Sequence, residues 1–194
     1  MLDNKAKSSD LVGSALAVAK PVTEKVGAGG VYTIQCFDKN GKLKWEAKSH
    51  NLVVNVGLQD MNTQYFKGSS YTAAWYIGLI TGPGSGTTIA AGDTMSAHGG
   101  WAENTGYSNA TRPAATFGTA TTADPSVIDN SASPASFSIN ATSTIAGAFL
   151  VNNSTKGGTT GTLFSASDFQ SPGDRSVVSA DTLNVTYTFS LDAV

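Results

Sequence analysis

The chain is poor in the residues that most catalytic and metal-binding sites use. Of its 194 residues only 13% are charged, two are histidine and one is cysteine, whereas about a quarter of an average globular chain is charged. The single cysteine, Cys36, excludes an intramolecular disulfide framework and a CxxC metal site. No stretch approaches the roughly 18 apolar residues of a membrane-spanning helix. We therefore expect no metal, no cofactor and no membrane association.

The few charges are divided unevenly along the chain. Residues 1–68 hold nine lysines and six acidic residues, a net charge of +3, and residues 69–194 hold three basic and eight acidic residues, a net charge of −5. Nucleic-acid-binding proteins carry clustered lysine and arginine, so direct binding of nucleic acid is not expected. The basic and acidic parts either face different neighbours or form a solvated arm beside an acidic domain.

Threonine, serine, glycine and asparagine stand where charged residues are missing, together with β-branched and aromatic residues. This composition is typical of short strands joined by tight turns. Residues 31–37 and 42–48 alternate apolar and polar side chains, and the Asn40-Gly41 pair between them predicts a hairpin. Further strands are predicted at 73–80, near Trp101, and at 114–117, 135–140, 144–151, 162–166, 176–178 and 182–191. The pattern predicts an all-β fold, an antiparallel β-sandwich or jelly roll over residues 31–194.

Within this β-rich chain one short helix is predicted, over residues 56–66. The apolar residues that would form its buried face recur at intervals of four, three and four: Val54, Leu58, Met61 and Tyr65. Asn55 is a suitable N-cap, and Gly68 is expected to end the helix. Residues 87–132 give the weakest pattern and are predicted to be a long excursion. Residues 152–161 are predicted to be an exposed loop.

Residues 1–30 are predicted to form an extended N-terminal arm. Lys5 and Lys7 precede an apolar stretch at 11–19 and imitate a secretion signal, but Asp3 and Asp10 interrupt the basic part. We therefore interpret the stretch as an arm, which Gly27 to Gly30 would separate from the domain. Terminal segments of this composition are ordered only when their own domain or a partner holds them, and we expect the arm to dock onto a partner subunit. The expected contacts are Leu11, Val12, Leu16, Val18, Val22, Lys5, Lys7, Lys20 and Lys25.

Asp93, His98 and Glu103, with Ser96 among them, are the only grouping that resembles a catalytic or metal site. A triad needs a histidine held by a carboxylate and in contact with a nucleophile, and a zinc site usually has more than one histidine. The glycine-rich text around these residues is typical of a loop in which Asp93 bonds backbone amides. We therefore interpret the three residues as loop-structuring and expect no enzymatic activity.

Several segments resemble a family of small proteins that decorate or cement the capsids of tailed bacteriophages and prophages. The resembling text is NLVVNVGLQD (51–60), AWYIGLI (74–80), AAGDTMSAHGGWAE (90–103), Tyr107, Arg112-Pro113, SINAT (138–142) and DTLNVTYT (181–188). The resemblance covers most of the chain after residue 50 and leaves the arm uncovered. It implies a jelly-roll-like domain without catalytic residues, located in the virion on the outer surface of the capsid and bound to the major capsid protein. Such a protein is also expected to self-associate as a dimer or trimer.

Three alternatives remain open on the sequence. The first is another virion part, such as a tail, baseplate or fibre-associated protein, although the chain has no internal repeat of the kind that fibres show. The second is a carbohydrate-binding β-sandwich that uses Trp75 or Trp101, although tryptophans are more often core residues. The third is an enzyme centred on His98.

Overall fold

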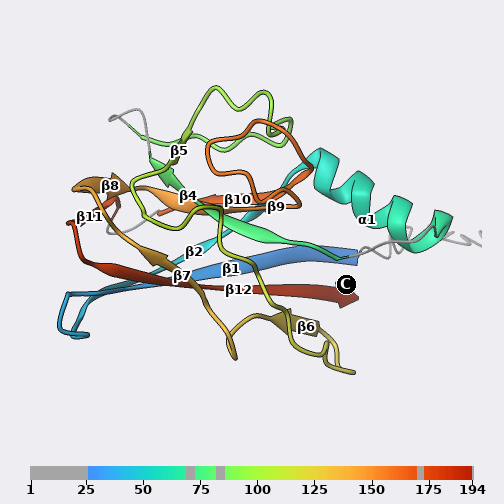
Figure 1. The fold of residues 1–194 in the computed structure, drawn as a ribbon. Coiled ribbons are helices and arrows are strands. Elements are labelled where there is room, and N and C mark those ends of the chain that lie inside the picture. The colour runs from blue at the N-terminus through green and yellow to red at the C-terminus, as the bar shows by residue number, and fades with distance from the viewer. Residues whose placement is uncertain (1–25, 69–72, 82–85, 170–172, 194) are drawn as a thin grey trace, which may run out of the picture.

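The computed structural model describes residues 26–68, 73–81, 86–169 and 173–193, which form two antiparallel sheets packed face to face (Figure 1). The first sheet has the order β2-β1-β12-β6, with β7 also paired to β12, and the second has the order β3-β10-β9-β4-β5. β11 and β8 form a separate pair. The elements are β1 (Val26–Phe37), β2 (Leu43–His50), β3 (Leu52–Val53), α1 (Asn55–Lys67), β4 (Tyr76–Thr81), β5 (Ala102–Asn104), β6 (Ser126–Asp129), β7 (Ala135–Ser138), β8 (Ser143–Ile145), β9 (Gly147–Val151), β10 (Leu163–Asp168), β11 (Arg175–Val177) and β12 (Thr182–Ala193). The predicted all-β sandwich is confirmed, and the jelly roll stays a prediction.

The hairpin between β1 and β2 forms as its sequence predicts. The carbonyl oxygen of Asp38 accepts the amide of Gly41 at 2.9 Å. The Asp38 carboxylate accepts the amides of Asn40 and Lys42 at 2.8 and 3.0 Å. Gly41 has a φ of 79°, a left-handed conformation that glycine adopts without strain. Local turn chemistry therefore accounts for the connection between β1 and β2.

β1 begins at Val26 and not at residue 31, which corrects the predicted boundary. Its twelve residues pair with the twelve of β12, from Val26 opposite Ala193 to Phe37 opposite Thr182. The glycines that were expected to interrupt regular structure are therefore part of the sheet. At Gly30 a Cβ atom would lie 2.6 Å from the Thr188 carbonyl oxygen. Glycine at this position permits close packing of the strands and does not break β1.

The main core lies between the two sheets. On β1, Tyr32, Ile34 and Cys36 are fully buried, and the residues between them are only partly buried. This alternation with a period of two points one face of the strand at the second sheet. β12 shows the same alternation through Leu183, Val185 and Tyr187. The predicted buried position of Cys36 is confirmed.

The second sheet is buried on both faces. β9 is buried at all five of its residues, which explains why its sequence is apolar without alternation. One face meets the first sheet. The other forms a second cluster that includes Phe149 and is covered by Met95 and Trp101, from the first part of the predicted excursion. The excursion is therefore a cover for the sheet, and Figure 1 shows it above β4, β9 and β10.

Among the other predicted strands, some are confirmed and one is wrong. The piece near Trp101 is β5, but the strand expected at 114–117 is wrong, because only Ala114 forms a bridge, to Tyr76. β6, which the sequence did not predict, pairs with one half of β12, and β7 pairs with the other half. Between them the Asn130 side chain donates to the Val185 carbonyl oxygen at 3.2 Å and accepts the Tyr187 amide at 2.7 Å. Asn130 thus continues the pairing where no strand is present.

The predicted helix is confirmed, but its predicted apolar stripe is only half buried, because Val54 is buried and Met61 packs against the core whereas the other two members are exposed. Leu58 is 40% exposed and Tyr65 is 83% exposed. The residue buried against β10 is Gly57, where a Cβ atom would lie 2.3 Å from the Phe164 carbonyl oxygen. The N-cap is Val54, so Asn55 is the first residue of the helix. Close backbone contact at Gly57, together with the packing of Val54, Val56 and Met61, sets the orientation of α1 and leaves Leu58 and Tyr65 exposed.

Candidate interaction surface

The predicted interface residues of the arm, from Lys5 to Lys25, lie outside the described residues. The structure does place the residue to which the arm is joined, since Val26 is the first residue of β1. In Figure 1 this end of β1 lies beside the last residues of β12 and at the same end of the sandwich as α1. The arm therefore joins the domain at the α1 end.

α1 extends beyond the ends of β1 and β12 (Figure 1). Its packing is with β10, through its first turns, and its last turn carries Tyr65 and Phe66, which are 83% and 77% exposed. The two rings contact each other edge to face, with 4.9 Å between centroids. They are the most exposed large hydrophobic side chains among the described residues. Exposed aromatic residues of this kind mark interaction surfaces.

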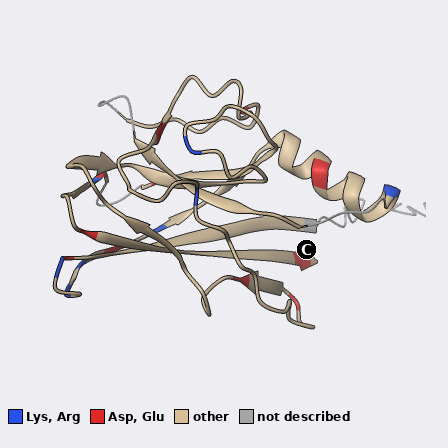
Figure 2. Cartoon of the chain, in the orientation of Figure 1, with Lys and Arg blue, Asp and Glu red and all other residues tan. Residues whose placement is uncertain are grey.

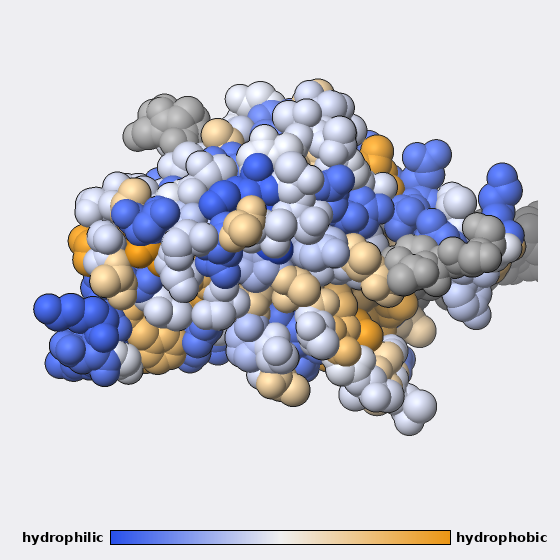
Figure 3. Space-filling model, in the orientation of Figure 1, coloured by the Kyte–Doolittle hydropathy of each residue, from blue (hydrophilic) through white to orange (hydrophobic). Residues whose placement is uncertain are grey.

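The opposite end of the sandwich carries a polar hairpin tip. The β1–β2 hairpin carries Lys39 and Lys42, both exposed, and Figure 2 shows its basic residues at the end away from α1. In Figure 3 the same tip is the most strongly hydrophilic area of this face of the molecule. The two ends therefore differ in charge, and the two most exposed large hydrophobic side chains lie on α1, although Leu43 beside the hairpin is also 47% exposed.

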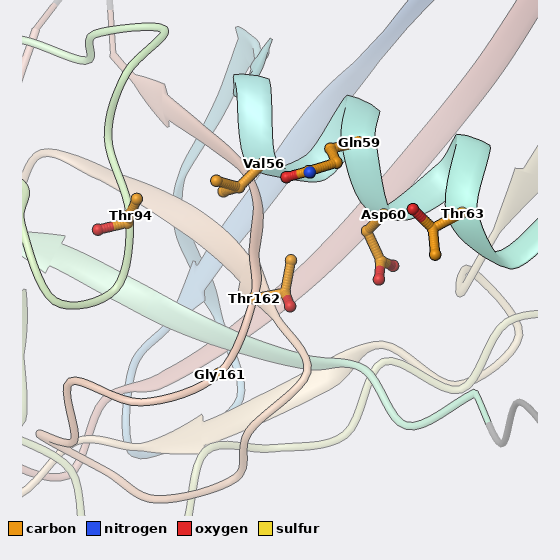
Figure 4. Close-up of a pocket in the computed structure, with 7 residues that line it drawn as sticks. All are labelled: Val56, Gln59, Asp60, Thr63, Thr94, Gly161 and Thr162. Carbon is orange, nitrogen blue, oxygen red and sulfur yellow. The ribbon is translucent and has the colours of Figure 1, made fainter.

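A shallow groove of about 360 Å³ runs beside α1 (Figure 4). Its lining comes from the helix and from two loops: Val56, Gln59, Asp60, Thr63, Thr94, Gly161 and Thr162. Asp60 is the only carboxylate in this lining, and it accepts a hydrogen bond from Gln64 at 3.2 Å. General acid–base pairs and metal sites need converging ionisable groups. The groove offers hydrogen-bonding atoms without such a pair.

Asp93, His98 and Glu103 do not converge on one point. Asp93 Oδ2 accepts the Trp101 indole N–H at 2.9 Å and the Ala90 amide at 3.0 Å. The His98 ring stacks on the Trp101 indole, with 3.9 Å between centroids, and its Nδ1 lies 3.0 Å from the Trp101 carbonyl oxygen. These contacts confirm the loop-structuring interpretation of Asp93 and His98. Over the described ranges, no three His, Cys, Asp or Glu residues are grouped so that they could hold a metal ion.

Glu103 belongs to a buried ion pair that the sequence did not predict. Its carboxylate accepts Arg112 Nε at 2.9 Å and Nη2 at 2.7 Å, and the Arg112 side chain is fully buried. The guanidinium also donates to the carbonyl oxygens of Asn153 and Gly158 at 2.9 and 2.8 Å. The Gly157 amide donates to Glu103 at 2.9 Å. The pair therefore ties the segment from β5 to Arg112 to the loop at 152–161.

Lys156, in the loop at 152–161, makes further bonds to the segment that follows β5. Its ammonium group donates to the carbonyl oxygens of Tyr107 and Asn109 at 2.9 and 2.7 Å. It also lies 4.6 Å from the centroid of the Tyr107 ring, a cation–π contact. We call Glu103, Arg112 and Lys156 the polar clamp. The loop predicted to be simply exposed is thus anchored at several backbone atoms.

A second polar cluster surrounds Asp181, just before β12. Its Oδ2 accepts Lys44 Nζ at 2.5 Å and the Val178 amide at 2.9 Å, and the Cys36 thiol donates to it at 3.6 Å. Burial raises the pKa of Asp181, but the hydrogen bonds from Lys44 and Val178 outweigh burial and leave that pKa below its usual range. Burial and the negative charge of Asp181 raise the pKa of Cys36 to about 12. Cys36 is therefore a protonated core residue.

A third cluster joins the two sheets through hydroxyl groups. The Tyr32 hydroxyl and Ser165 Oγ lie 2.9 Å apart, and Ser165 Oγ donates to the Tyr187 hydroxyl at 3.3 Å. Asn51 Nδ2 donates to the same Tyr187 hydroxyl at 2.8 Å. Burial raises the pKa of both tyrosines above the usual value. These bonds satisfy buried polar atoms and favour one relative position of the sheets.

Trp101 packs as a core residue, which confirms the more common interpretation at this position, and the carbohydrate alternative at the partly buried Trp75 stays a prediction. Trp101 is 5% exposed, with His98 stacked on it and Phe149 at 5.2 Å. Trp45 and Trp75 are partly buried against the core between the sheets. A carbohydrate platform on Trp101 would need an accessible indole face, which this burial removes.

Comparison with known proteins gives no relative: no family model, curated protein or solved structure matches the chain. Within the described ranges, no helix has the length and apolar character needed to cross a membrane. What the protein does must therefore be inferred from its own residues.

Proposed function

We propose that the protein is a structural virion protein that decorates and cements the capsid of a tailed bacteriophage. It binds the outer surface and stabilises contacts between major capsid protein subunits. The observation that carries this proposal is the location of the arm, which joins the sandwich at Val26, at the end where α1 exposes Tyr65 and Phe66. The resemblance of segments within residues 51–188 to decoration proteins supports it.

A cementing role requires a rigid body that transmits load between the subunits it joins. The second sheet is buried on both faces, and the polar clamp anchors the loop at 152–161 to the segment that follows β5. Close packing on both faces resists deformation. These features suit a protein that adds binding energy to a shell under internal DNA pressure, and the role requires no chemical step.

In this proposal the arm reaches across a seam to a neighbouring capsid subunit. Twenty-five extended residues span at most about 80–90 Å. Its apolar contacts are Leu11, Val12, Leu16, Val18 and Val22, and each contributes about 1.5–3 kcal/mol if fully buried, before ordering costs. Lys5, Lys7, Lys20 and Lys25 steer the arm toward an acidic surface, a contribution that weakens with salt.

Deleting residues 2–25 tests the proposal. The shortened chain keeps the whole of β1, so we expect a folded, soluble β domain that binds shells of the same phage at least tenfold more weakly. A matched control, Lys39→Ala/Lys42→Ala, alters the opposite end and should bind as the full chain does. Sedimentation of the protein with shells that lack it gives the affinities. Equal binding by the shortened chain, or its failure to fold, would show that the arm belongs to the domain and would contradict the proposal.

A further inference from the structure

On the second half of α1, Met61 is the one apolar residue that packs against the core within the described part of the protein. Gly57 fixes the first turns on β10, whereas Leu58, Asn62, Tyr65 and Phe66 are all exposed. Helices shorter than about 12–15 residues are marginally stable in water without tertiary contacts, and α1 has 13 residues. Two adjacent aromatic rings on such a helix are therefore expected to be covered in the working assembly.

The exposed residues form a regular surface. Leu58, Asn62 and Phe66 are spaced four residues apart and so lie on one ridge along the helix. Tyr65 lies beside Phe66, with 4.9 Å between the ring centroids. The two charged residues of α1, Asp60 and Lys67, lie roughly 140–160° around the helix from Asn62, at about 100° per residue. The ridge is therefore apolar at both ends, carries an amide at its centre and bears no charge.

This ridge is complementary to itself. When a two-fold axis passes through Asn62, an antiparallel copy places its Phe66 opposite Leu58, and the two Asn62 amides meet. Each amide is both donor and acceptor, so identical side chains can bond to each other. A central asparagine of this kind fixes register in helix pairs. Since the ridge is uncharged, no like charges face each other.

We infer that α1 pairs antiparallel with α1 of a second copy of this chain. The surface area that this pairing would bury also supports a second copy as the partner. Each aromatic side chain can bury about 150–250 Å², so four rings and two leucines from a symmetric pair bury on the order of 1,000 Å², near the lower limit for a specific interface. A single ridge against an unrelated surface provides half as many anchors. Because α1 extends beyond β1 and β12 (Figure 1), the helices can meet ahead of the sandwiches. This pairing does not depend on the proposed capsid role.

Sedimentation velocity on the full chain between about 1 and 500 µM tests the pairing, since an interface of this size gives a weak dimer. We expect a shift from monomer to dimer with rising concentration. Phe66→Asp should move the midpoint at least tenfold higher. The control Leu43→Asp, at another exposed leucine, should dimerise as the unmodified chain does. Circular dichroism checks that each variant is folded.

Disulfide trapping gives a second readout that does not require loss of an aromatic residue. Asn62→Cys should form a linked dimer under mild oxidation, whereas Thr63→Cys, exposed on the groove side of the same helix, should not. The native Cys36 is buried and does not compete. A full chain that stays monomeric throughout, a Phe66→Asp dimer as strong as the unmodified one, or equal trapping at both positions would overturn the inference. So would a monomer whose Phe66→Asp variant loses only shell binding, since the capsid would then cover α1.

Discussion

Replacing Arg112 with methionine removes the guanidinium at the centre of the polar clamp. The side chain is fully buried and makes two bonds to Glu103 and one each to the carbonyl oxygens of Asn153 and Gly158. Methionine fills similar space but leaves the carboxylate without its counter-charge. Loss of one partner from a buried ion pair costs about 3–5 kcal/mol. For a chain of this length each kcal/mol lowers Tm by about 2–4 °C, so we expect a fall of roughly 6–20 °C.

Thermal and denaturant unfolding, followed by circular dichroism, measure the change. A double variant, Arg112→Met/Glu103→Gln, removes the uncompensated charge as well and should recover part of the lost stability. The matched control is Lys48→Met, because the Lys48–Glu46 pair is exposed and 3.7 Å long, and its loss should cost less than about 1 kcal/mol. If Arg112→Met costs no more than this control, or the double variant is no more stable than the single one, the clamp does not stabilise the fold as described.

Two further predictions concern the core and the response to acid. Gly78→Ala places a Cβ atom 2.1 Å from the buried Phe149 ring and should lower the free energy of unfolding by about 1–3 kcal/mol in thermal unfolding. The control Gly29→Ala, where a Cβ atom would have nothing within 4 Å, should change it by less than about 0.5 kcal/mol. Equal effects of the two substitutions would refute the packing argument. The pKa of Asp181 is held below its usual range, so its contribution to stability is complete above about pH 4 and is lost as pH falls through the folded-state pKa. Urea midpoints of Asp181→Asn should therefore lie below those of the unmodified protein at pH 7 and converge with them in acid; a constant gap would contradict this.

Features that depend on neighbouring residues could be predicted from the sequence. The Asn40-Gly41 turn forms because glycine adopts the left-handed conformation there. α1 also lies within one residue of its predicted bounds. The strand predicted at 182–191 is also present, as β12. In each case the signal is contained within a few residues.

Features that depend on distant partners could not be predicted. Gly30 is a strand residue because it pairs with β12, and the nearby Thr188 carbonyl leaves no space for a side chain there; the local sequence contains neither condition. α1 turns Leu58 outward because Gly57 contacts the backbone of β10. Arg112 finds its acceptors more than 40 residues away in the chain, at Asn153 and Gly158. The only sequence signal for this ion pair was an arginine and a glutamate nine residues apart in a charge-poor segment.

The location of the protein in its parent particle tests the central claim most directly. Electron cryomicroscopy of intact particles, compared with particles that lack this protein, would show which density it accounts for. The proposal predicts a β-sandwich on the outer surface of the capsid, in hundreds of copies. Density confined to the tail, baseplate or fibres, at a few copies to a few dozen, would contradict it.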